Sequence, residues 1–185
     1  MRFPADRVYR KTGSSIGTKL GIAVVLIFMV GAAWFYSRWT DGRQPVLVAG
    51  QKIQVMDGDS FVVGPRKLRL DGIDAPEYAQ TCKDALGQDW PCGRTARAAL
   101  EKLLTQPGLA CDAETHDRYA RALATCRSAA TADIAAAQVL DGMAVSDEFH
   151  TMRAFGDEED AARKAKRGIW QGEFVRPAKF RGQNP

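Results

Sequence analysis

The feature that most constrains this chain is an apolar run near its N-terminus. Leu20 to Tyr36, "LGIAVVLIFMVGAAWFY", contains 17 residues and no charge. At a rise of about 1.5 Å per residue, an α-helix of this length just crosses the hydrocarbon core of a bilayer. We therefore expect a transmembrane signal-anchor helix at residues 20–36. A basic cytoplasmic arm at 1–19 precedes it, and a linker at 37–45 follows it.

The charges on either side of this run predict its orientation. Residues 1–44 hold seven Lys or Arg and two acids, a net charge of +5, and residues 45–185 hold nineteen and twenty, a net charge of −1. Basic residues next to a first membrane helix stay in the cytoplasm. We therefore expect a single-pass protein of the cell inner membrane, with its main domain on the periplasmic or extracellular side. Gly31-Ala32-Ala33 resembles a signal-peptide cleavage site, so a secreted protein is the alternative.

Four cysteines lie in the part of the chain that we expect to be exported: Cys82, Cys92, Cys111 and Cys126. An even number outside the cytosol favours disulfides, for which three pairings exist. Residues 109–127 alternate as a β-hairpin does, and a turn centred between Arg118 and Tyr119 would place Cys111 opposite Cys126. We expect that disulfide, with Cys82–Cys92 closing a second loop.

Strand and helix signals follow one another along residues 46–182, which we expect to form one domain with a tail at 183–185. Short β-branched segments between Gly and Pro predict the first strands at Val46–Ala49, Lys52–Met56, Phe61–Val63 and Lys67–Leu70. Helical spacing then predicts three helices: one around residues 96–104, one at Thr131–Asp141 with Thr131 as N-cap, and one at Asp157–Arg167 with a solvated charged face. This order of elements predicts an α+β fold, a small β-barrel with packed helices.

An unusual number of carboxylates occupies Val55 to Tyr78, "VMDGDSFVVGPRKLRLDGIDAPEY". Alternation along a strand places Leu68 and Leu70 on one face and Arg69 on the other. Core residues and charged residues therefore separate, and the carboxylates can converge. Two converging carboxylates with a backbone oxygen predict a site for a hard divalent cation such as Ca²⁺. The loop is not an EF-hand, because its sixth and twelfth positions, counted from Asp57, are Val62 and Leu68.

Several motifs carry a family resemblance. The motifs "DGDS" and "RLDGIDAPE", then "DRYAR" some forty residues later and "RGIWQGEF" near the end, resemble the staphylococcal nuclease (thermonuclease) family over roughly residues 45–182. The resemblance implies a five-stranded OB-fold barrel with about three packed helices. It also implies a Ca²⁺-dependent nuclease that hydrolyses phosphodiester bonds of DNA, RNA or both and leaves 3′-phosphate ends.

The resemblance further implies a role for each matching position. Three positions would bind Ca²⁺: Asp59, Asp74 and the backbone carbonyl of Ala75. Three would act on the phosphodiester: Arg69 and Arg121 as a phosphate clamp, and Glu77 as the group that activates or orients the attacking water. Three would support these groups: Asp57 and Ser60 beside the metal, and Tyr119 against the substrate. Asp71 is expected to be only a strand-edge charge.

Two positions depart from the family pattern, and other functions stay open. Ser60 stands where the family often has Thr, and Ala120 replaces the usual Gly, which would strain the backbone if φ there is positive. The main alternative is a catalytically inactive OB-fold module that binds nucleic acid or protein. A structural calcium-binding envelope protein is a further alternative, although it would need neither arginine. We expect a monomer whose partners are nucleic acid and, through the N-terminal helix, the inner membrane.

Overall fold

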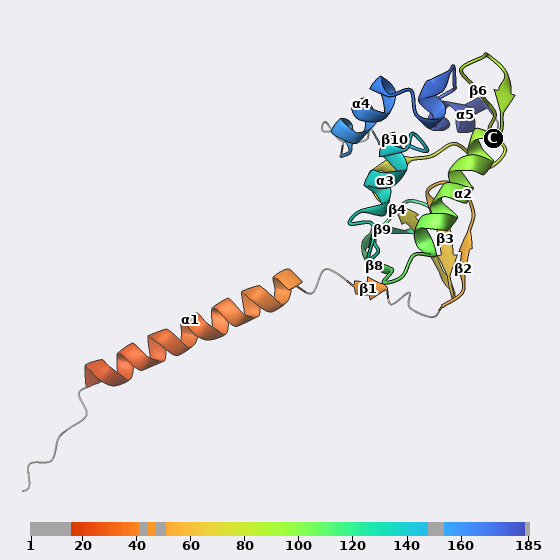
Figure 1. Cartoon of the computed structure of the whole chain (residues 1–185). Helices are drawn as coiled ribbons and strands as arrows, with labels where there is room; N and C mark the ends of the chain where they lie inside the picture. Colours follow the sequence, from red (N-terminus) through yellow and green to blue (C-terminus); the bar gives the residue numbers. More distant parts are fainter. Residues whose placement is uncertain (1–15, 41–43, 47–50, 148–153, 184–185) are drawn as a thin grey trace, which may run out of the picture. The chain divides into compact units, whose positions relative to one another are not determined.

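A computed structural model describes residues 16–40, 44–46, 51–147 and 154–183. The chain divides into two compact units, Met1–Gly42 and Arg43–Pro185. The first unit contains helix α1 (Ile16–Thr40), which covers the apolar run and extends beyond it at both ends (Figure 1). By length and hydropathy, none of the helices among the described residues qualifies as a membrane span. The transmembrane helix therefore stays a prediction.

The second unit is built on a six-stranded sheet with the order β1-β8-β9-β4-β3-β2. Its strands are β1 (Gln44–Val46), β2 (Ile53–Val55), β3 (Ser60–Val63), β4 (Arg66–Leu70), β8 (Ala110–His116) and β9 (Ala122–Arg127). All neighbouring pairs are antiparallel except β4 and β9, which are parallel. The α+β class is confirmed.

The five-stranded barrel is corrected to a six-stranded sheet. The additional strand is β1, which pairs with β8 so that Val46 lies opposite Cys111. Consecutive strands β1 and β2 stand at opposite edges of the sheet and, in the described part of the chain, do not pair with each other. Of the predicted strand Val46–Ala49, only Val46 lies within the described residues.

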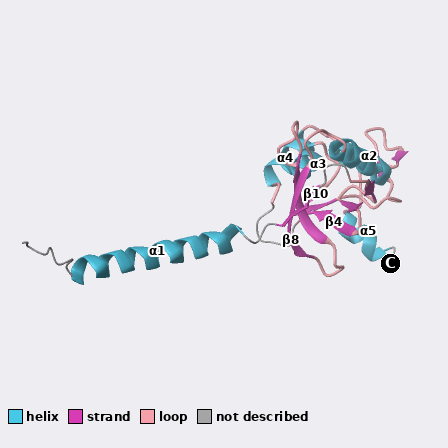
Figure 2. Ribbon diagram, turned by 90° about the horizontal axis from the view of Figure 1, so that it is seen from below, coloured by secondary structure: helices cyan, strands magenta, loops and turns pink. Residues whose placement is uncertain are grey.

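Smaller elements surround this sheet. Two further sheets have two strands each: β5 (Ile73–Asp74) pairs with β10 (Val145–Ser146), and β6 (Cys82–Lys83) pairs with β7 (Asp89–Trp90). The helical elements are α2 (Cys92–Leu104), α3 (Ile134–Leu140), α4 (Gly156–Lys164), the 3₁₀ turn η1 (Gly168–Gln171) and α5 (Pro177–Gln183). In Figure 2, α2, α3 and α4 lie together over one side of the sheet, and α5 lies apart from them.

The core lies between the sheet and helices α2 and α3. Leu68 and Leu70 of β4 are completely buried, as the alternation predicts, and pack in one cluster with Phe61 of β3. Leu100 of α2 and Ile134 of α3 close the cluster from the helix side. Each such side chain contributes about 1.5–3 kcal/mol on burial, so the two leucines anchor β4 firmly in the domain.

Two of the helix predictions need correction. Asp133, and not Thr131, caps α3, because its carboxylate accepts hydrogen bonds from the amides of Ala135 and Ala136 at 2.9 and 3.1 Å. The charged face of α4 is also not fully solvated. Glu159 is completely buried and accepts hydrogen bonds from the Ser146 amide and the Arg163 guanidinium.

Both predicted disulfides are present. Cys111 lies opposite Cys126 in the β8–β9 ladder, with their Cα atoms 4.1 Å apart. Cys82 and Cys92 are joined as well, with a Cα separation of 5.6 Å. The ladder register shifts by one residue beyond Ala113. The residues at the tip of this hairpin therefore do not pair in the register that places Cys111 opposite Cys126. The tip carries the motif "DRYAR".

Candidate active site

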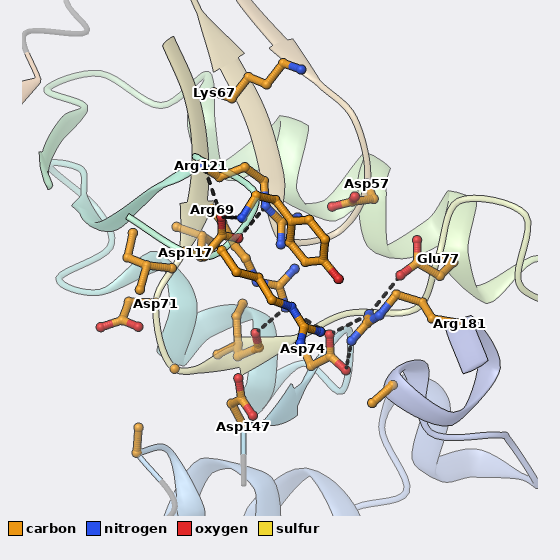
Figure 3. Close-up of a pocket in the computed structure, with 18 of the residues that line it drawn as sticks. Asp57, Lys67, Arg69, Asp71, Asp74, Glu77, Asp117, Arg121, Asp147 and Arg181 are labelled. Atoms are coloured by element: carbon orange, nitrogen blue, oxygen red, sulfur yellow. Dashed lines mark hydrogen bonds and ion pairs between the residues drawn. The ribbon is translucent and has the colours of Figure 1, made fainter. Parts of the chain in front are cut away.

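Charged side chains line a cavity of about 1080 Å³ beside β4 (Figure 3). Its acidic lining residues are Asp57, Asp71, Asp74, Glu77, Asp117 and Asp147. Its basic lining residues are Lys67, Arg69, Arg118, Arg121 and Arg181. These residues come from segments that are far apart in the sequence, and the fold of the second unit brings them to one place.

Arg69 joins the two carboxylates that the sequence predicts as metal ligands. Its Nη1 donates to Asp59 Oδ1 at 2.6 Å, and its Nη2 donates to Asp74 Oδ1 at 2.9 Å and to the Ile73 carbonyl at 3.0 Å. The Arg69 side chain is only 12% exposed. It points to the cavity because the leucines on either side of it point into the core. Arg69 therefore fixes the distance between the two aspartates.

The turn "DGDS" holds Asp59 in a buried position behind the residues that line the cavity. Asp57 Oδ1 accepts hydrogen bonds from the amides of Asp59 at 3.0 Å and Ser60 at 2.7 Å, which holds the turn closed. Asp59 itself accepts from Ser60 Oγ at 2.6 Å and from the Ala75 amide at 2.9 Å. Burial raises the pKa of Asp59 to about 7, because the loss of hydration outweighs the opposing effect of Arg69.

Two glycines permit the close approach of backbones around the site. A Cβ on Gly58 would lie 2.7 Å from the Cβ of Ala75, nearer than carbon atoms can pack. A Cβ on Gly93, in the first turn of α2, would overlap the carbonyl oxygen of Glu77. The turn that carries Asp59 and the loop that carries Glu77 therefore both depend on a missing side chain.

Glu77 is positioned by Gln80, a buried residue that the sequence did not indicate. The Glu77 backbone amide donates to the side-chain oxygen Oε1 of Gln80 at 3.2 Å, and the Gln80 backbone amide donates to the Glu77 backbone carbonyl at 2.7 Å. Gln80 Nε2 donates in turn to the Val175 carbonyl at 2.6 Å. The Glu77 carboxylate, 33% exposed, projects into the cavity.

Arg121 reaches the same cavity from the tip of the β8–β9 hairpin. Asp117 holds its guanidinium by accepting from Nε at 2.7 Å, and Arg121 Nη1 donates to Ser60 Oγ at 3.2 Å. Ala120, between Asp117 and Arg121, has a φ of 59°. This is the left-handed conformation that glycine adopts without strain, so the alanine that replaces the usual glycine is strained. Tyr119 is 63% exposed, with the guanidinium carbons of Arg118 and Arg121 at 4.9 and 5.4 Å from its ring centre.

Arg181 of α5 is a further arginine of the cavity and was not predicted. Its Nη1 donates to Asp74 Oδ1 at 2.9 Å and to Glu77 Oε1 at 2.8 Å, and its Nη2 donates to Asp74 Oδ2 at 3.2 Å (Figure 3). These carboxylates raise the pKa of Arg181 against the opposing effect of burial. No local motif in the sequence marks Arg181. Asp117 was also not predicted as a site residue, although it begins the motif "DRYAR" four residues before Arg121.

The structure thus brings most of the predicted site together. Six predicted residues line the cavity: Asp57, Arg69, Asp74, Glu77, Tyr119 and Arg121. Tyr119 lies at its exposed rim, while Asp59, Ser60 and Ala75 are buried beneath it. Asp71 also lines the cavity, exposed at the end of β4.

The donors suit a hard cation by their chemistry. Asp59 and Asp74 offer carboxylate oxygens, and Ala75, whose amide donates to Asp59, offers a backbone carbonyl; oxygen atoms of these kinds are the ligands that Ca²⁺ prefers. Among the residues that can be described, no cluster of three or more Asp, Glu, His or Cys side chains forms a ready metal cage. Arg69 contacts oxygens of both carboxylates, and Arg181 contacts those of Asp74, so a cation has to share or displace these contacts.

The comparison with known proteins agrees with this geometry. Residues 67–172 match the family described as staphylococcal nuclease homologue, a range that contains Arg69, Asp74, Glu77 and Arg121. The chain is also 29% identical over 120 residues to the succinoglycan biosynthesis protein ExoI of Rhizobium meliloti (strain 1021). This similarity covers 64% of the present chain and 63% of that relative. The matched range includes more than half of the chain and most of the charged cavity, and the protein therefore belongs to the staphylococcal nuclease homologue family.

Proposed function

We propose that this protein is a Ca²⁺-dependent nuclease that hydrolyses phosphodiester bonds of DNA, RNA or both. The observation that carries the proposal is the meeting of Arg69, Arg121, Asp74 and Glu77 in one cavity. Guanidinium groups bind phosphate through paired hydrogen bonds, and a carboxylate beside a bound phosphate can take a proton from water. A protein that only bound a metal would need neither arginine.

In this mechanism Arg69 and Arg121 bind the phosphoryl oxygens from two directions. Charge on these oxygens grows toward the transition state, and donors already in place stabilise that charge strongly. Glu77 accepts the proton of the attacking water. Asp59, Asp74 and the Ala75 carbonyl would hold Ca²⁺, which supplies further positive charge to the phosphate when bound.

Supporting roles follow from the contacts around these groups. Asp57 keeps the "DGDS" turn closed, and Ser60 connects Asp59 to Arg121 through its hydroxyl. Tyr119 offers an exposed ring at the rim on which a base or ribose can stack. Since these contacts address the phosphate and the ring faces of nucleotides, they do not favour DNA over RNA.

The test is a cleavage assay with the full-length chain in mild detergent. Plasmid DNA and a structured RNA are incubated with the protein in Ca²⁺ and, separately, in EGTA. We expect cleavage in Ca²⁺ that EGTA abolishes. Binding of nucleic acid without cleavage would instead support the inactive OB-fold module, and cleavage unaffected by EGTA would remove Ca²⁺ from the mechanism.

We also propose that α1 anchors the protein in the inner membrane, with the nuclease domain outside the cytoplasm as a monomer. Apolar side chains of α1 are exposed around the helix, including Phe28 at 75% and Ile27 at 71%, which suits an apolar surrounding. Two disulfides suit an oxidising compartment. Carbonate extraction of membranes tests the anchor: release of a shortened chain would indicate a cleaved signal peptide.

A further inference from the structure

We propose that Arg181 acts as a built-in counter-cation at the metal carboxylates and thereby couples Ca²⁺ binding to substrate binding. This inference rests on the proposed nuclease function and concerns the same cavity. Arg181 contacts one predicted metal ligand, Asp74, and the predicted proton acceptor, Glu77. It would be a positioning residue that determines when the metal binds.

Arg181 contacts the carboxylate oxygens of Asp74 that a metal ion would need. Both of its terminal nitrogens donate to Asp74, one to each carboxylate oxygen, at 2.9 and 3.2 Å. The nitrogen that contacts Oδ1 also contacts Glu77 at 2.8 Å. A two-pronged arginine–carboxylate contact is among the stronger hydrogen-bonded ion pairs, particularly where solvent is partly excluded. The Asp74 side chain is only 9% exposed, whereas that of Arg181 is 43% exposed.

The C-terminal segment presents Arg181 to the cavity in a defined way. Gln80 Nε2, in the loop after Glu77, donates to the Val175 carbonyl at 2.6 Å, and the Lys83 amide of β6 donates to the Glu173 carbonyl at 2.8 Å. Helix α5 then begins at the buried Pro177. Its residues Ala178, Arg181 and Gly182 line the cavity, as positions three and four apart on one helix face do.

The charges explain why Arg181 would oppose the metal. Arg181 and a Ca²⁺ ion both require the oxygens of Asp74, and both carry positive charge. A cation that binds there must share or displace the guanidinium, and the contact with Arg181 therefore weakens metal binding. A substrate phosphate reverses this effect, because it offers Arg181 another anionic partner and adds negative charge beside the metal. By linkage, phosphate then strengthens Ca²⁺ binding, and Ca²⁺ strengthens phosphate binding by the same factor.

The family comparison separates Arg181 from the rest of the site. The matched range ends at residue 172, before α5 begins. Arg69, Glu77 and Arg121 lie inside that range, so the two arginines expected from the resemblance are already accounted for without Arg181. Arg181 lies outside the matched range, on the C-terminal segment.

The experiment measures Ca²⁺ affinity directly, by isothermal titration calorimetry of the full-length chain in detergent. Four proteins are compared: the natural sequence, Arg181→Gln, Arg181→Lys, and Lys179→Gln as a control that removes an exposed positive charge from the same helix. Each is titrated alone and with a short phosphorothioate oligodeoxynucleotide that is cleaved slowly. The oligonucleotide's own Ca²⁺ binding is subtracted.

We expect Arg181→Gln to bind Ca²⁺ about tenfold more tightly than the natural sequence when no oligonucleotide is present, the effect of losing about one charged contact. The oligonucleotide should raise Ca²⁺ affinity in the natural sequence and in Lys179→Gln, and much less in Arg181→Gln. Arg181→Lys keeps the charge without the two-pronged contact, and we expect an intermediate affinity. It also serves as the test if Arg181→Gln does not fold.

Two outcomes would overturn the inference, and they differ in what they leave standing. Equal Ca²⁺ affinity in the natural sequence and Arg181→Gln, or equal enhancement by the oligonucleotide in both, rejects the role of Arg181 and leaves the proposed nuclease intact. An absence of Ca²⁺ binding in every variant, with and without oligonucleotide, rejects the metal in the proposed function and the present inference with it.

Discussion

Asp117 binds Arg121 through both its backbone and its side chain. Asp117 Oδ2 accepts from Arg121 Nε at 2.7 Å, Oδ1 accepts from the Arg121 amide at 2.9 Å, and the Asp117 amide donates to the Arg121 carbonyl at 2.9 Å. The aspartate thus closes the hairpin tip and orients the guanidinium at the same time. The placement of Arg121 in the cavity follows from this double contact.

Asp117→Ala is therefore expected to lower nuclease activity by about 10- to 100-fold, because Arg121 loses its orientation and not its charge. Steady-state kinetics on a defined oligonucleotide provide the measurement. Asp112→Ala is the matched control. Asp112 lies in the same hairpin and accepts a hydrogen bond of 2.8 Å from Arg127, and neither residue lines the cavity. Equal losses in both variants would point to general damage of the hairpin and against an orienting role for Asp117.

Asp117 also predicts a dependence of stability on pH. Burial alone would raise the pKa of Asp117, but hydrogen bonds from Arg121 and the Tyr119 amide outweigh it and lower the pKa below its ordinary value. A carboxylate with a lowered pKa in the folded state stabilises the fold above its unfolded pKa of about 3.9. This stabilisation is lost as the pH falls through the folded pKa. Thermal unfolding of the natural sequence and Asp117→Ala should differ at pH 6, and the difference should shrink as the pH falls below the unfolded pKa of about 3.9.

Glu77→Gln tests the proton acceptor with little change of shape. The amide keeps the size of the side chain but cannot take a proton from water, so we expect kcat to fall by about 10²–10³ while the melting temperature changes little. Asp71→Asn removes another carboxylate from the same cavity and should leave kcat nearly unchanged. If both substitutions have the same small effect, Glu77 does not take the proton.

The left-handed backbone at Ala120 predicts a stabilising substitution. At φ 59° a Cβ approaches the following carbonyl, so Ala120→Gly removes strain of about 1–2 kcal/mol, of which the greater flexibility of unfolded glycine offsets about half. We expect a net gain of about 0.5–1 kcal/mol in the free energy of unfolding. Ala130→Gly, at an exposed position without positive φ, should be destabilising instead. Denaturant titrations of the two variants decide the sign.

Local patterns predicted those parts of the site that depend on local geometry. The strict alternation around Arg69 predicted which face of β4 it occupies, and the burial of Leu68 and Leu70 confirms that assignment. The pairing of Cys111 with Cys126 was equally accessible, because one hairpin register fixes it. The bulge after Ala113 was not, because no residue pattern in the hairpin marks the one-residue shift in register.

Contacts between distant segments could not be predicted in this way. Arg181 follows Glu77 by 104 residues, and their contact depends on how the C-terminal segment packs against the Gln80 loop. Glu159 resembled any other acid of a solvated helix face, and its burial depends on donors supplied by Ser146 and Arg163. In both cases a charged residue found its partner through tertiary packing, which a pattern along one segment does not encode.

Strand β4 alternates between side chains that form the core and a side chain that joins the two aspartates of the cavity. Leu68 and Leu70 are therefore required for folding, whereas Arg69 between them is required for the site. A sequence drifting away from nuclease activity can change side chains that serve only the cavity. It can change the two leucines only by risking its foldability. In descendants that have lost catalysis, we expect the two leucines of this strand to persist longer than Arg69.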